Sequence, residues 1–163
     1  MKKDIFIDNN IASQYFSNPI NEEYKKLIDW LFTDNENEET DAYLVVSPYL
    51  LREYHESNRN ANSRTNIIKI VEDLTKQERL NQFSKKDIEA FQQKHFSKKI
   101  LKKLLSNAQD RNHIPAVLLS DRKMALSEDN NFLSDLQEFS DFKPITAKRP
   151  ENLDYKSQNT EGV

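Results

Sequence analysis

Residues 4–8, Asp4-Ile5-Phe6-Ile7-Asp8, form a short apolar run with an acid at each end. The β-branched residues within this run predict a buried strand. Similar apolar runs predict further strands at residues 43–46, 124–126 and 144–147. Helical spacing of apolar residues predicts helices at 24–32, from 48 onward, at 67–74, at about 85–105 and at 110–119. Strands that alternate with helices predict an α/β fold with a mostly parallel sheet flanked by helices on both faces.

Composition narrows the class of protein. The chain has 163 residues, of which 31% are charged and 36% hydrophobic, which suits one domain, and we expect it to span residues 1–149. Residues 150–163 are polar and without periodicity, so we expect a disordered tail there. Cys is absent, and the only glycine is Gly162, which excludes thiolate metal sites and glycine-rich phosphate loops. No long apolar segment follows Lys2 and Lys3, so we expect a cytoplasmic protein that does not enter a membrane.

Charge is unevenly distributed along the chain. Residues 21–42 carry eight acids and two lysines, a local net charge of 2 − 8 = −6, whereas residues 64–103 carry eleven Lys or Arg and five acids, a net of 11 − 5 = +6. A basic segment on an acidic protein is compatible with contacts to a nucleic-acid backbone. The residues predicted to make them are Lys98, Lys99, Lys102 and Lys103. The alternative is an ordinary solvated helical face, and charge alone favours that alternative.

Three acids follow the predicted strands in a way that brings them together. Asp8 ends the first strand, Glu53 lies in the helix after the second, and Asp129 follows the third by a few residues. In a parallel sheet, ligands bind beyond the carboxyl ends of the strands. If the strands are neighbours, these three carboxylates meet at that edge.

Carboxylates gathered without basic partners repel one another unless a cation neutralises them. All-oxygen ligands select Mg²⁺ or Mn²⁺. Such ions orient water and stabilise charge on a phosphate. The chain offers no competing machinery, because its three histidines form no HExxH zinc pair and no serine lies in a nucleophile-elbow context.

Four segments in order resemble the PIN-domain ribonuclease family, including its VapC-like toxins. They are Ile5-Phe6-Ile7-Asp8-Asn9-Asn10, the stretch from Val45 to Tyr54 with its Glu, Asp110-Arg111-Asn112-His113-Ile114, and Ser127-Glu128-Asp129-Asn130-Asn131-Phe132. The match runs from residue 4 to about 147, although residues 64–108 form an unusually long middle region and Pro115 is unexpected. The resemblance adds Asp110 to the acids as the third in chain order.

The resemblance implies a PIN-like three-layer sandwich that cleaves RNA with a divalent metal at Asp8, Glu53, Asp110 and Asp129. Asn10 and Ser127 are expected to support the site by orienting a carboxylate or a water, or else to make only local turn hydrogen bonds. The resemblance also implies an antitoxin partner, as in toxin–antitoxin pairs, and a homodimer. The unclaimed aromatic residues Tyr15, Phe16 and Trp30 suggest such contacts as well.

Other interpretations stay open. The chain could be a non-catalytic PIN-like scaffold module, or a phosphatase of the haloacid-dehalogenase type, although the latter needs an acid where Asn10 stands. Glu56 and Glu128 are rivals of Glu53 and Asp129, and Asp110 could simply be the N-cap of its helix. Asp121 follows that helix, so we predict that it lies at the opposite edge of the sheet, roughly 15 Å from Asp110.

Overall fold

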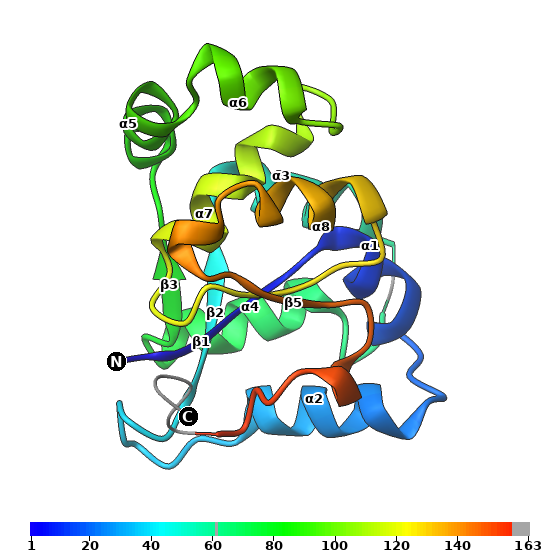
Figure 1. Ribbon diagram of the computed structural model, residues 1–163. Helices are drawn as coiled ribbons and strands as arrows, with labels where there is room; N and C mark the ends of the chain where they lie inside the picture. Colours follow the sequence, from blue (N-terminus) through cyan, green and yellow to red (C-terminus); the bar gives the residue numbers. More distant parts are fainter. Residues whose placement is uncertain (61, 158–163) are drawn as a thin grey trace.

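The core of the protein is a five-stranded parallel sheet, and the computed structural model describes residues 1–60 and 62–157. The strands lie in the order β3-β2-β1-β4-β5 (Figure 1). Their bounds are Lys3–Ile7 (β1), Ala42–Val46 (β2), Leu80–Gln82 (β3), Met124–Leu126 (β4) and Ile145–Ala147 (β5). The predicted α/β fold is therefore confirmed, with β3 as an additional strand.

The central strand β1 is buried along its whole length. Ile5 pairs with Leu44 of β2, and Phe6 pairs with Ala125 of β4. A central parallel strand is covered on both faces, which is why its sequence is a continuous apolar run. By contrast, β3 is a short edge strand whose residues, Leu80–Gln82, are mostly polar, so it lacks that signal.

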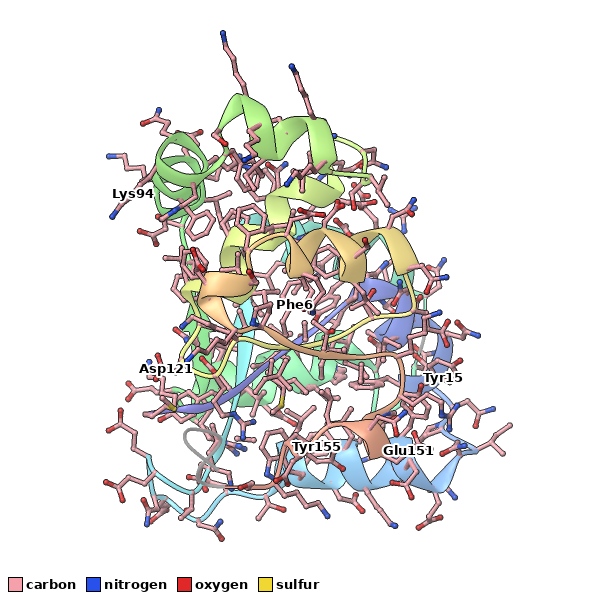
Figure 2. The ribbon with its side chains drawn as sticks, viewed as in Figure 1. Phe6, Tyr15, Lys94, Asp121, Glu151 and Tyr155 are labelled. Carbon is pink, nitrogen blue, oxygen red and sulfur yellow. The ribbon has the colours of Figure 1, made fainter. Side chains whose placement is uncertain are left out.

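Helices cover both faces of the sheet and give three layers (Figure 1). On one face α2 (Glu22–Phe32) packs with α4 (Ile67–Lys76), and on the other α7 (His113–Leu119) packs with α8 (Asn130–Gln137). The Phe6 side chain lies between the sheet and this second layer, with its ring 5.7 Å from that of Phe132 (Figure 2). The three-layer arrangement leaves the ends of the strands open at two edges.

Short helices occupy the carboxyl edge. After β1 the chain forms α1 (Asn9–Ile11) and a π-helical turn at Ala12–Phe16, and after β2 it forms α3 (Pro48–Asn58). The Tyr54 hydroxyl of α3 donates to the Ile7 carbonyl at 2.5 Å. This bond fixes α3 against the end of β1.

The amino edge is organised by a buried acid, Asp4. Its carboxylate accepts hydrogen bonds from the backbone N–H of Asp121 (2.8 Å) and of Arg122 (2.9 Å) and from Asn81 Nδ2 (2.7 Å). The exposed carboxylate of Asp121 accepts the Lys2 N–H at 2.7 Å. Asp121 therefore lies at the amino edge, as predicted; Figure 2 shows it across the molecule from Tyr15 of the π-helical turn.

Residues 150–157 differ from the disordered tail that we expected. Pro150–Asn152 form a 3₁₀ turn, and Leu153 and Tyr155 are buried beside α2. Arg122 Nη1 donates to the Tyr155 carbonyl at 2.9 Å. A buried guanidinium thus anchors this segment through its backbone. Residues 158–163 of the expected tail lie outside the described residues.

The predicted helix at 85–105 is interrupted. It divides into α5 (Lys85–His95) and α6 (Lys98–Lys103), because Ser97 caps a new helix by accepting the Ile100 N–H at 3.2 Å. The helix predicted from Asp110 instead begins as a 3₁₀ turn at Asp110–Asn112 before α7. The single-helix prediction for residues 85–105 was therefore wrong. Its apolar positions Ile88, Phe91, Ile100 and Leu101 are helical, but Leu104 and Leu105 lie beyond the end of α6.

Candidate functional site

Asp8 lies at the carboxyl end of β1 with 9% of its surface exposed. Its Oδ2 accepts from Ser127 Oγ at 2.7 Å and from Asn10 Nδ2 at 3.5 Å, and its Oδ1 accepts the Asn9 N–H at 2.8 Å. Burial raises the pKa of Asp8, and this effect outweighs the opposing hydrogen bond from Ser127. The protein therefore holds a carboxyl group here at an electrostatic cost.

Ser127 and Asn10 connect Asp8 to the loop after β4. The buried Ser127 Oγ accepts the Asp129 N–H at 3.0 Å, and Asn10 Oδ1 accepts the Glu128 N–H at 3.3 Å. The Asp8 N–H itself donates to the Leu126 carbonyl at 2.9 Å. These bonds hold Asp8 in place, which fits the supporting role expected of Asn10 and Ser127.

Glu53 of α3 faces a histidine that the sequence did not identify as part of the site. His113 Nε2 lies 2.5 Å from Glu53 Oε2, and an ionised carboxylate can only accept, so the ring donates. The side chain of Glu53 is 19% exposed and that of His113 is 2% exposed. The rival acid Glu56 instead pairs with Arg52 at 3.0 Å on the exposed side of α3. The geometry therefore favours Glu53 as the site residue of this helix.

Asp110 is half-buried at the start of the 3₁₀ turn before α7. The N-cap alternative is wrong, because the N-cap position of the 3₁₀ turn is Gln109 and that of α7 is Asn112. The Asp110 N–H itself donates to Asn107 Oδ1 at 2.8 Å. The pKa of Asp110 is raised by burial, and His113 opposes the shift while the charges of Asp129 and Glu53 add to it. Asp110 therefore lies in the field of two other candidate acids.

Asp129 is both the N-cap of α8 and one of the four candidate site acids. Its Oδ1 accepts the N–H groups of Asn131 (2.9 Å) and Phe132 (3.2 Å) at the start of α8. The rival acid Glu128 accepts a hydrogen bond from the Tyr15 hydroxyl and so points toward the π-helical turn. Asp129 is thus the acid of this loop whose charge acts on Asp110.

A further acid, Asp135 of α8, holds the backbone segment that precedes Asp110. It is completely buried, and its two carboxylate oxygens accept the N–H groups of Leu105 (2.7 Å) and Ser106 (2.9 Å). These contacts fix the segment that leads from α6 to Asp110. The sequence reasoning missed Asp135, although an acid on the apolar face of α8 is the signal that could have identified it.

Three of the four predicted acids, Glu53, Asp8 and Asp110, act electrostatically on the buried ring of His113. Burial lowers the pKa of His113, but the hydrogen bond that the ring donates to Glu53 and the charges of Glu53, Asp8 and Asp110 outweigh this and raise it. His113 thus shares the field of three of the acids, and the fourth, Asp129, acts on Asp110. The structure thus places each predicted acid within electrostatic range of at least one other, and the metal-binding role of the four stays a prediction.

The donor chemistry of this cluster suits a hard cation. Within residues 1–60 and 62–157, no three His, Asp or Glu side chains are close enough together to hold one metal ion. Mg²⁺, however, commonly uses only one or two carboxylates and completes its octahedron with water and substrate phosphate. The carboxylates therefore fit an ion of this type by the nature of their oxygen ligands.

The predicted nucleic-acid contacts lie on the outermost helix. All four lysines of α6 are exposed, and Lys103 lies 4.0 Å from Glu138. α6 leads through the segment held by Asp135 to Asp110, so the basic helix and the acids are joined by a short, fixed connection. In Figure 1, α6 projects from the same side of the molecule as α7 and α8.

Comparisons of the chain with models of protein families, with curated proteins and with solved structures found no match. In the described part of the chain, no helix is both long and apolar enough to cross a membrane. The functional interpretation therefore depends on the site itself.

Proposed function

We propose that the protein is a divalent-metal-dependent endoribonuclease that hydrolyses phosphodiester bonds of RNA. The observation that carries this proposal is the clustering of Asp8, Glu53, Asp110 and Asp129 at the carboxyl edge of the sheet, with Asp8 buried at the cost of a raised pKa. The resemblance of the four sequence segments to PIN domains supports it. A nuclease site explains why acids that have no Lys or Arg partner among the described residues lie near one another.

One or two of the four acids would bind Mg²⁺ or Mn²⁺, and water and substrate phosphate would complete the coordination of the ion. When bound, the ion would orient water and stabilise negative charge on the phosphate. Other residues of the chain hold these carboxylates in position. Ser127 and Asn10 hold the Asp8 carboxylate, the N-terminal N–H groups of α8 hold Asp129, and Asp135 fixes the backbone that presents Asp110.

The alternatives are less well supported. A haloacid-dehalogenase-type phosphatase needs an acid at position 10, but Asn10 donates its amide to Asp8 there. A scaffold module does not need Asp8 and Asp110, whose pKa values are raised by burial and by the charges of neighbouring acids. The expected antitoxin partner and homodimer rest on the resemblance alone. Tyr15 is stacked on Tyr24, Phe16 is buried and Trp30 contacts Tyr155, so these aromatic residues have partners within the chain.

The decisive experiment is an RNA cleavage assay with Mg²⁺ or Mn²⁺, comparing the wild type with Asp8→Asn. The variant should lose about 100-fold or more of the rate, because metal-supported charge stabilisation is worth several kcal/mol and each ~1.4 kcal/mol is tenfold. Equal cleavage by both proteins would indicate a contaminating nuclease and contradict the proposal. Hydrolysis of a phosphate monoester without RNA cleavage would favour the phosphatase, and RNA binding without cleavage would favour the scaffold.

The lysines of α6 provide a separate prediction about substrate binding. Replacing Lys98, Lys99, Lys102 and Lys103 by Ala should weaken binding of single-stranded RNA and flatten its salt dependence. Each lost phosphate contact removes about 0.7 from the slope of log affinity against log salt. Binding is measured by fluorescence anisotropy at several salt concentrations.

A charge-matched control is available on the opposite layer. Lys25 and Lys26 of α2 and Lys69 and Lys76 of α4 are exposed, and replacing these four by Ala removes the same charge. If both quadruple variants flatten the slope equally, the effect reflects net charge, and α6 is only a solvated helix face.

A further inference from the structure

His113 is a buried polar side chain at the first position of α7. It is 1% exposed, and its ring lies 5.7 Å from that of Phe6 and 6.4 Å from that of Phe132. An imidazole loses hydration in such surroundings and needs a hydrogen bond in return. An apolar side chain would fill this position at lower cost, so the polar ring calls for an explanation.

Among residues 1–60 and 62–157, Glu53 is the only hydrogen-bond partner of the ring. His113 Nε2 donates to Glu53 Oε2 at 2.5 Å, whereas among the described residues Nδ1 has no partner. Burying one ring nitrogen unsatisfied is unfavourable. The contact with Glu53 therefore accounts for the presence of a histidine, because packing against Phe6 and Phe132 requires no nitrogen.

The contact restricts a flexible side chain. A glutamate on a helix has three rotatable bonds and would otherwise exchange between solvent and the site. The hydrogen bond holds Oε2 against α7, and the charge of Glu53 acts on both Asp8 and Asp110. Within residues 1–60 and 62–157, no hydrogen bond occupies the second oxygen, Oε1.

We propose that His113 is the positioning residue of the acidic site and that it fixes the Glu53 carboxylate in the orientation in which it binds the divalent cation. This inference rests on the proposed function, because it assigns a role to His113 through the cation site of that function. Groups that hydrogen-bond a ligand carboxylate orient it, and their loss commonly costs 10- to 100-fold in metal affinity.

The test uses two amides that differ by one methylene. The Nε2 of glutamine can take the place of His113 Nε2, whereas the Nδ2 of asparagine matches only the Nδ1 position, which faces no partner. Mn²⁺ affinity is measured from the electron paramagnetic resonance signal of free Mn²⁺, without RNA. His113→Asn should lower the affinity about 10- to 100-fold, and His113→Gln should stay within about threefold of the wild type.

A Glu53→Gln background separates positioning from general damage to the fold. If His113 acts through Glu53, His113→Asn should cause no further loss of Mn²⁺ affinity in that background. A similar loss in both backgrounds, or equal losses for the Asn and Gln variants, would overturn the proposal and leave His113 as a packing residue.

The ribonuclease proposal can be tested separately from the role of His113. If the wild type binds Mn²⁺ but does not cleave RNA, the ribonuclease proposal is wrong, and the comparison of the Asn and Gln variants still decides the role of His113. If the wild type binds no Mn²⁺ at millimolar concentration, both proposals are overturned.

Discussion

Replacing Asp110 by Asn is expected to lower the rate of RNA cleavage by about 100-fold or more, while Asp121→Asn leaves it within about twofold. Asp110 lies in the field of Glu53, Asp129 and His113, and in the described part of the chain its carboxylate makes no hydrogen bond that an amide would break. The change therefore removes a charge from the site with little cost to the fold.

Asp121 is the matched control because it precedes the same strand, β4, from the other end of α7. Its carboxylate accepts the Lys2 N–H at the amino edge, and its backbone N–H donates to Asp4. The length of β1, five residues, separates that edge from Asp8, which is roughly 16 Å at about 3.3 Å per residue. A metal ion binds its ligands at about 2 Å, so one ion cannot reach both edges.

Initial rates on a single-stranded RNA with saturating Mg²⁺ measure both variants, and circular dichroism confirms that each is folded. Loss of cleavage only in Asp121→Asn, or an equal loss in both, would contradict the assignment of the site. Unchanged cleavage in both variants would show that Asp110 is not a ligand, even though its charge lies near the other acids.

The parts of the fold that could be predicted carry local signals. β1 is a continuous apolar run because both of its faces are covered, and Asp8 is conspicuous because an acid rarely closes a buried strand. If β1 and β4 are neighbouring parallel strands, Asp8 and Asp129, which follow them, must lie at the same edge of the sheet. Asn10 and Ser127 then lie within two residues of these acids, so their supporting positions follow from the same step.

The parts that could not be predicted depend on contacts distant in sequence. α7 is buried at six of its seven residues, so it shows no amphipathic pattern that would reveal whether His113 faces the core or solvent. The segment at 150–157 has only Leu153 and Tyr155 as apolar anchors, and it is held by Arg122 through backbone carbonyls. Every residue has a backbone carbonyl that can accept a hydrogen bond, so the sequence does not indicate which carbonyls Arg122 will bind.

The four acids also differ in how many structural hydrogen bonds their side chains make. Asp129 caps α8 and would be kept for that reason alone, and Asp8 accepts three hydrogen bonds. Asp110 has fewer structural roles, because it accepts no hydrogen bond in the described structure, whereas Glu53 accepts the hydrogen bond of the buried His113 ring. Substitution of Asp110 is therefore the cleanest probe of chemistry, since stability should change least there.

Removing divalent cations should abolish cleavage, by about 1,000-fold or more, and adding back Mg²⁺ or Mn²⁺ but not Ca²⁺ should restore it. Mg²⁺ and Mn²⁺ suit an octahedral all-oxygen site, whereas Ca²⁺ prefers longer bonds and more ligands. The measurement is the initial rate after dialysis against EDTA, followed by titration of each ion. Cleavage undiminished in excess EDTA would rule out the metal-dependent mechanism.

The same cation should stabilise the fold in a pH-dependent way. Burial raises the pKa of Asp8 and of Asp110 above the ordinary value of about 3.9. In the metal-free protein their contribution to stability is thus fully present below that ordinary value and is lost as the pH rises through the raised pKa values. Mg²⁺ binds the ionised forms, so the increase in melting temperature that it causes should be small near pH 4 and grow toward pH 7.

Asp110→Asn should reduce this increase, because one of the two titrating carboxyls is gone, whereas Asp121→Asn should leave it unchanged. A Mg²⁺ effect that is the same at pH 4 and pH 7 would show that the ion binds elsewhere than at these acids.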